Sequence, residues 1–173
     1  MPMIDALLAE LEQESLTTRR VLERVPESKL SWKPHPKSMS LGQLALHVAT
    51  VPGNVAELAS MDTVEPPPFV QPEAATAAEL VPALTASVAK AREHLGNFDD
   101  AAMNGTWRLM SNGRELLAMP RVALARAIML NHWYHHRGQL LVYLRLLDIP
   151  VPSVYGPSAD ENPFADLAAR EAS

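Results

Sequence analysis

The chain has 173 residues, 47% of them hydrophobic and 20% charged, which excludes a disordered or collagen-like protein and favours one globular domain over residues 1–173. The absence of cysteine excludes disulfides, thiolate metal ligands and a cysteine nucleophile, so any metal site must use imidazole or carboxylate ligands. A net charge of −5 without a cluster of Lys and Arg argues against a nucleic-acid partner.

The first residues of the chain do not predict a targeting signal, because residues 1–5 are not a basic stretch followed by an apolar one. No run of 18 apolar residues occurs anywhere, so no membrane-spanning helix is predicted. We therefore expect a cytoplasmic protein without a membrane partner.

Prolines, which disrupt helix interiors, divide the chain into four predicted helices, and no segment has the alternating pattern of a strand. The first helix runs from about Met3 to Val25. Its apolar stripe carries the small polar residues Ser15 and Thr18 in the middle. These residues indicate either close helix packing or the wall of a cavity.

The second helix is predicted to begin at Ser40, because Ser40 and Gln43 have the spacing of a capping box. Its apolar stripe continues until Pro52 and Gly53, which we expect to bend or end the helix. His47 lies on the edge of this stripe.

A proline-rich connector at residues 65–68 leads to the third helix, which begins either at a second capping box, Thr76 with Glu79, or near Pro82. Residues 96–118 contain two Asn-Gly turn signals and are too many for a tight connection between antiparallel helices. We expect this segment to be a crossover that is partly a hairpin.

The fourth helix is predicted to have Pro120 in its first turn and to end near Leu147, before an irregular tail at about residues 148–173. His132 and His136 occupy the two central positions of its apolar stripe. Histidines four positions apart lie about 40° apart around a helix and about 6 Å apart along it, so both can reach one ion.

A single divalent metal ion would satisfy both imidazoles, which are costly to bury on an apolar face without partners. The simpler alternative is a pair of core histidines that are hydrogen-bonded to neighbours. His47 on a neighbouring helix is the candidate third ligand. Three imidazoles leave a coordination position open, as in catalytic zinc sites; zinc or nickel is the leading expectation, and iron or copper also suits imidazole.

The other histidines have structural explanations. His135 points about 60° away from His132 around the helix, so we leave it out of the metal site. His35 lies in a loop. His94 lies near the end of the third helix, where a cationic side chain interacts favourably with the helix dipole. The glutamate of His-Glu-x-x-His peptidases is missing. Arg137 could contact an anionic substrate, but a solvated surface arginine is the more frequent case.

Three segments carry recognisable motifs. The first comprises Trp32-x-Pro34, Ser38-Met39-Ser40-Leu41-Gly42-Gln43-Leu44 and His47, and it resembles the second-helix signature of the DinB-like family. The resemblance to its fourth-helix signature lies in Asn131-His132-Trp133-Tyr134-His135-His136-Arg137-Gly138-Gln139-Leu140. Residues 148–153 and 155–161 are similar to the tail of many members, so the likeness covers nearly the whole chain.

This resemblance implies an all-α four-helix bundle in up-down-down-up order, with a long crossover before the last helix. It also implies a three-histidine metal site at His47, His132 and His136, and a homodimer. The damage-inducible label of the family describes regulation and does not imply contact with DNA.

Members of the wider family include thiol-dependent transferases, such as bacillithiol transferases, and the mycothiol-dependent maleylpyruvate isomerase. Our leading hypothesis rests on the open coordination position: an enzyme in which a metal-bound thiol or water attacks a small electrophilic substrate. The resemblance adds a low-molecular-weight thiol as the expected cosubstrate. The first alternative is a non-catalytic protein that binds a small ligand through its metal. The second is a dimeric interaction module in which the three histidines are core residues.

Overall fold

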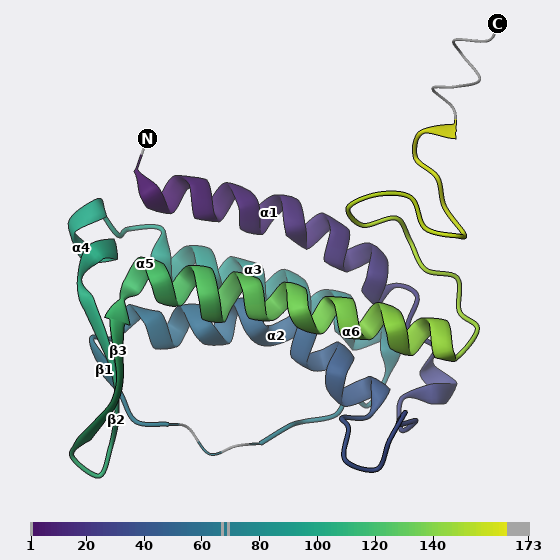
Figure 1. Ribbon diagram of the computed structural model, residues 1–173, viewed down its shortest axis with the longest axis horizontal. Helices are drawn as coiled ribbons and strands as arrows, with labels where there is room; N and C mark the ends of the chain where they lie inside the picture. Colours follow the sequence, from purple (N-terminus) through teal and green to yellow (C-terminus); the bar gives the residue numbers. More distant parts are fainter. Residues whose placement is uncertain (1, 67, 69, 166–173) are drawn as a thin grey trace, which may run out of the picture.

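The computed structural model describes residues 2–66, 68 and 70–165, and within them long helices lie side by side with a small sheet at one end (Figure 1). The last long helical segment is continuous but has three parts. The long helical segments are α1 (Met3–Leu22), α2 (Leu41–Ser60), α3 (Leu80–Leu95) and the rod formed by α5 (Arg121–Leu124), η3 (Ala125–Asn131) and α6 (His132–Leu146).

The start of α2 is the one predicted from the capping box. Gln43 N donates to Ser40 Oγ at 3.1 Å, and Ser40 N donates to Gln43 Oε1 at 2.9 Å. The helix does not end at Pro52 and Gly53 but continues to Ser60.

Two contacts compensate for Pro52 inside α2. Proline has no N–H to donate to the carbonyl four residues earlier, that of Val48. This carbonyl instead accepts a hydrogen bond of 2.7 Å from the buried indole Nε1 of Trp133 on α6. Gly53 N donates to Ser87 Oγ of α3 at 2.8 Å, and a Cβ at Gly53 would lie only 2.8 Å from the carbonyl oxygen of Ser87. The glycine therefore permits α2 and α3 to pack closely.

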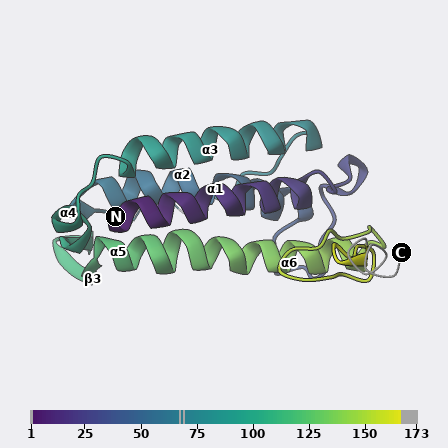
Figure 2. The same cartoon turned by 90° about the horizontal axis from the view of Figure 1, so that it is seen from above.

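The core lies between the helices, where their apolar stripes meet. Seen from above, α2 lies between α3 and the α5–α6 rod, and α1 overlaps α2 in this view (Figure 2). Residues with less than 2% exposed surface come from every long helix, and the largest include Leu11, Leu44, Leu84, Met129 and Trp133. Among the described residues no helix is long and apolar enough to cross a membrane.

A three-stranded sheet shows that the all-α prediction is wrong in part, although the molecule is mostly helical. The sheet has the order β1 (Thr63–Val64), β2 (Thr106–Ser111) and β3 (Arg114–Pro120), with β1 parallel to β2 and β2 antiparallel to β3. The expected hairpin is confirmed: its turn consists of Asn112 and Gly113, with φ angles of 50° and 76°. Trp107 Nε1 donates to the Leu58 carbonyl at 3.0 Å and ties the sheet to the end of α2.

The position of the long crossover is corrected by the structure. In Figure 1, α1 and the α5–α6 rod run in one direction, and α2 and α3 run in the other. Because α2 and α3 are parallel, the connection that runs along the molecule lies between them and not before the last helix. The segment between α3 and α5 stays at one end and holds α4 (Asp100–Asn104) and the hairpin.

The remaining boundaries agree closely with the sequence. The Thr76 capping box begins a short 3₁₀ turn, η2 (Ala77–Glu79), which leads directly into α3, so Pro82 falls in the first turn of that helix. From Asp148 to Phe164 the chain contains turns but no helix or strand, as expected of the tail. The part of that prediction concerning residues 166–173 lies outside the described residues.

Candidate metal centre

Three histidines converge between α2 and the α5–α6 rod, as the sequence predicted. His47 lies in the second turn of α2, His132 is the first residue of α6, and His136 follows one turn later. Their ring centroids are 4.5 to 5.3 Å apart. One ring nitrogen from each lies within 4.8 Å of the others, and all three side chains are half-buried. Three imidazoles so placed could hold one metal ion.

Hydrogen bonds to the Nδ1 atoms fix which nitrogen of each ring on α6 can bind a metal. His132 Nδ1 lies 3.3 Å from the Ile128 carbonyl oxygen, and His136 Nδ1 lies 2.8 Å from Gln139 Oε1. Both oxygens accept hydrogen bonds, which favours the tautomer with the hydrogen on Nδ1 and a lone pair on Nε2 of each neutral ring. The two Nε2 atoms are 2.8 Å apart. In this tautomer the two lone pairs would repel, and a metal ion between them would remove the repulsion.

A π-helical turn, η3, directly precedes His132. Such turns shift the backbone hydrogen-bond register by one residue and occur often at functional sites. The turn ends at Asn131, and its Ile128 carbonyl is the oxygen that the His132 ring contacts. The sequence contains no proline or glycine in this turn that could have predicted it.

Burial keeps the three imidazoles neutral. It lowers the pKa of His47 to about 4, with additional contributions from the charges of His136 and His132. Burial is also the largest cause of the lowered pKa values of His132 and His136. At neutral pH the cluster therefore offers uncharged rings with lone pairs, the form that binds metals.

No carboxylate joins the cluster among the described residues, since the converging group contains only the three histidines. A cavity of about 520 Å³ borders His136, Gln139 and Tyr143 on α6 and the loop before α2. A metal ion at this centre would thus keep part of its coordination sphere open, with space beside it for a small molecule.

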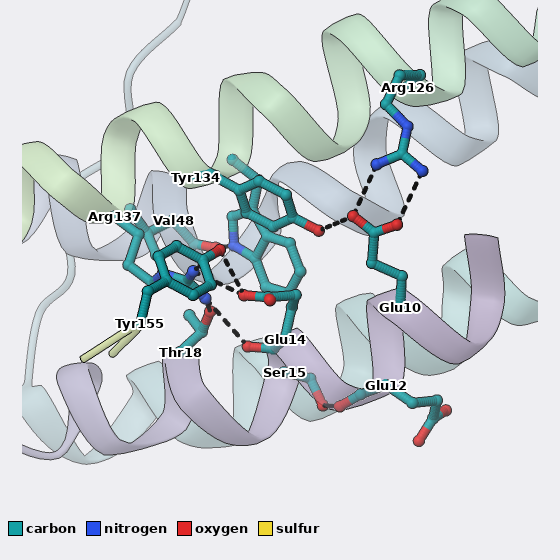
Figure 3. Close-up of polar contacts among 11 residues, drawn as sticks. Glu10, Glu12, Glu14, Ser15, Thr18, Val48, Arg126, Tyr134, Arg137 and Tyr155 are labelled. Atoms are coloured by element: carbon teal, nitrogen blue, oxygen red, sulfur yellow. Dashed lines mark hydrogen bonds and ion pairs between the residues drawn. The ribbon is translucent and has the colours of Figure 1, made fainter. Parts of the chain in front are cut away.

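The exposed His135 is not part of the converging group, although its ring centroid is 5.0 Å from that of His136. The interpretation of Arg137 as a surface residue is wrong, because only 1% of its surface is exposed. Its guanidinium pairs with Glu14 of α1 at 2.6 Å (Figure 3). It therefore faces α1, whereas the histidines of the same helix face α2.

Sequence reasoning missed this polar contact between α1 and α6. Arg137 also donates to Thr18 Oγ1 at 3.0 Å and to the Tyr155 hydroxyl at 2.5 Å (Figure 3). Of the two interpretations of Thr18, the buried contact with Arg137 favours close helix packing. The sequence feature that could have indicated this contact is the spacing of Glu10 and Glu14, two acidic residues one helical turn apart.

A second contact of the same kind begins one turn earlier on α1 and reaches residues of η3 and α6. The Glu10 carboxylate accepts two hydrogen bonds from Arg126, at 2.7 and 2.8 Å, and one from the Tyr134 hydroxyl at 2.8 Å (Figure 3). The hydrogen bond from Arg126 is the largest cause of the lowered pKa of Glu10.

The chain is similar to known proteins in sequence and in fold. The chain is 24% identical to the uncharacterized protein YrdA of Bacillus subtilis, with 91% of each chain covered. Its fold is similar to the crystal structure of a DinB-like protein from Bacillus cereus, with a TM-score of 0.68, 23% identity, and 87% of this chain and 97% of that chain covered. A DinB-like protein of Bacillus subtilis, YjoA, gives a TM-score of 0.65 at 19% identity and covers 86% and 96%.

The family model described as the DinB family matches residues 1–165. This match covers all the elements that carry the three histidines, as well as most of the tail. The chain therefore belongs to the DinB family.

Proposed function

We propose that His47, His132 and His136 bind one divalent metal ion, zinc or nickel, and that the protein is a metal-dependent enzyme acting on a small electrophilic substrate. The observation that supports this most is the pair of His132 and His136 Nε2 lone pairs, 2.8 Å apart, beside a cavity. A cluster with only three protein ligands resembles catalytic rather than structural zinc sites, which are usually closed by four.

Bound at this centre, the metal would lower the pKa of a coordinated thiol or water and so provide a nucleophile near neutral pH. Two residues of the chain would orient the metal ligands. Ile128 and Gln139 contact the Nδ1 atoms of His132 and His136, so that each Nε2 would be free to face a bound ion. The thiol is favoured because the DinB-like family includes thiol-dependent transferases. We further propose a cytoplasmic homodimer.

The second candidate function is a protein that binds a small ligand through its metal without turnover. It is favoured by the position of the histidines, because a metal ion would link α2 to α6 and could serve structure alone.

The two functions are distinguished by removing the metal. Metal content is first measured by mass spectrometry on protein purified without a histidine tag. The protein is then treated with a chelator, and both the Tm and the consumption of thiols with a panel of electrophiles are recorded before and after zinc or nickel is restored. Zinc at about a hundred times its Kd should stabilise the fold by about 2.7 kcal/mol. Thiol consumption that returns with the metal supports the enzyme, and a Tm shift without any reaction supports the binding protein.

A further inference from the structure

The cavity beside His136 has positively charged side chains in its lining and no negatively charged ones. Two of its lining residues are charged, Lys33 and Lys37, and no acidic residue lines it. The whole chain contains 20 acidic and 15 basic residues. Neither lysine forms an ion pair with any residue that the structure describes. The positive charge of this cavity therefore has no partner within the described part of the chain.

The loop that carries the two lysines is fixed against the helix of the metal centre. Trp32 packs edge-on against Tyr143 of α6, with ring centroids 5.6 Å apart. The Leu41 N–H donates to the Trp32 carbonyl at 2.9 Å, and Ser38 N donates to the His35 carbonyl at 2.9 Å. Both lysines are thus held at the cavity by a defined backbone, although their side chains are exposed.

One uncharged donor, the Gln139 amide, also lines the cavity. Gln139 accepts from His136 through Oε1, and its amide nitrogen donates to no described residue, so it is available to a ligand. The cavity volume of about 520 Å³ lies within the range of small-molecule sites. Two lysines are too few for a nucleic-acid backbone, whose binding requires many neutralised phosphates.

We propose that this cavity binds a small organic acid, through contacts between its carboxylates and Lys33 and Lys37. Free backbone N–H groups at a helix N-terminus would be a further reason to favour a phosphate over a carboxylate. At the adjacent start of α2 the capping box already satisfies the Gln43 N–H. The inference rests on the proposed function in one respect, that the acid is the substrate or thiol cosubstrate next to the metal.

The test uses mercaptosuccinate, a thiol with two carboxylates, and 1-thioglycerol, a thiol with none. Binding of each is measured by calorimetry on the chelator-treated protein and on the cobalt-loaded protein, in which thiolate ligation produces a charge-transfer absorption. The variants are K33A/K37A and, as a control with the same loss of charge, K29A/R114A. Lys29 and Arg114 are exposed and do not line the cavity.

We expect mercaptosuccinate to bind the wild type more tightly than 1-thioglycerol does. Replacing Lys33 and Lys37 should weaken its binding roughly five- to tenfold, and K29A/R114A should remain within about twofold of the wild type. Affinity should also fall as salt is added. Equal weakening in both double variants, no preference for the acid, or tighter binding of inorganic phosphate would overturn the inference.

The same experiment distinguishes failure of the metal proposal from failure of the anion-site proposal. A chain that takes up no cobalt but binds mercaptosuccinate through the two lysines retains the anion site and loses the metal site. A chain that takes up cobalt and binds both thiols equally well retains the metal site and loses the anion site.

Discussion

The two faces of α6 carry polar clusters that differ in whether their polar groups find partners within the protein. Toward α1, Arg137 has acceptors on Glu14, Thr18 and Tyr155. Toward α2, His132 and His136 direct two Nε2 lone pairs at each other. Both terminal nitrogens of the Arg137 guanidinium have acceptors in the described part of the chain, so this cluster is complete within the protein. The comparison indicates that a complete cluster connects helices, whereas an incomplete one marks a place for a ligand.

The largest effect that would sharpen this comparison is expected from His132→Ala. This change removes one of the three converging rings, so stoichiometric metal should be lost entirely. Helical content by circular dichroism should stay near that of the wild type, because the apolar core holds the helices together. His135→Ala, one exposed ring on the same helix, is the control and should keep its metal. Full metal content in His132→Ala would remove this residue from the proposed site.

The next largest effect is expected in the complete cluster. Arg137→Met leaves the largely buried Glu14 carboxylate without its cation and should lower the free energy of unfolding by about 3–5 kcal/mol, measured with urea. Glu14→Leu in the same chain should recover much of the loss, because no unpaired charge then remains. Metal content should be unchanged in both variants. A decrease of metal binding that parallels the loss of stability would mean that the two faces of α6 are coupled.

A smaller effect is expected from pH in the metal-free protein. The pKa of His47 is about 4 in the folded chain, and an unfolded histidine titrates near 6.5. Between these values the unfolded state binds more protons, so stability falls as the pH decreases from about 6.5 to 4. Because His47 is only partly buried, we expect a loss of about 1–2 kcal/mol rather than the full value of the shift.

Urea unfolding at several pH values measures this contribution, and His47→Gln should flatten the curve. A metal-free His47→Gln variant with the same pH dependence as the wild type would contradict the assignment to His47.

The smallest effect is expected from Tyr155→Phe. The Tyr155 hydroxyl contacts both Arg137 and Glu14, but the residue is 72% exposed, so water can replace it. We expect a loss of about 0.5–1 kcal/mol in urea unfolding. A loss above about 3 kcal/mol would contradict this expectation and would mean that water does not replace the Tyr155 hydroxyl in its contacts with Arg137 and Glu14.

Local patterns predicted the parts of the molecule that depend on neighbouring residues. The capping box at Ser40, the turn at Asn112 and Gly113, and the i, i+4 spacing of His132 and His136 each involve residues at most four positions apart. Among the parts that depend on distant residues, the convergence of His47 with His132 and His136 was expected, with support from the resemblance to the DinB-like family, and others were missed. The two residues of β1 pair with a strand more than 40 positions later in the chain. Arg137 contacts Glu14, which lies 123 positions earlier. No sequence pattern in this chain encodes those pairings.

The hydrogen bond from Trp133 to the Val48 carbonyl has a consequence for the metal centre. Val48 follows His47 directly, and Trp133 follows His132 directly, so this single buried bond sets the axial register between the two helices beside the ligands. Pro52 makes the carbonyl available, because it cannot donate to it. If the three histidines bind a metal as proposed, this bond would help to preorganise the centre, because helices already aligned by protein contacts lower the entropic cost of binding.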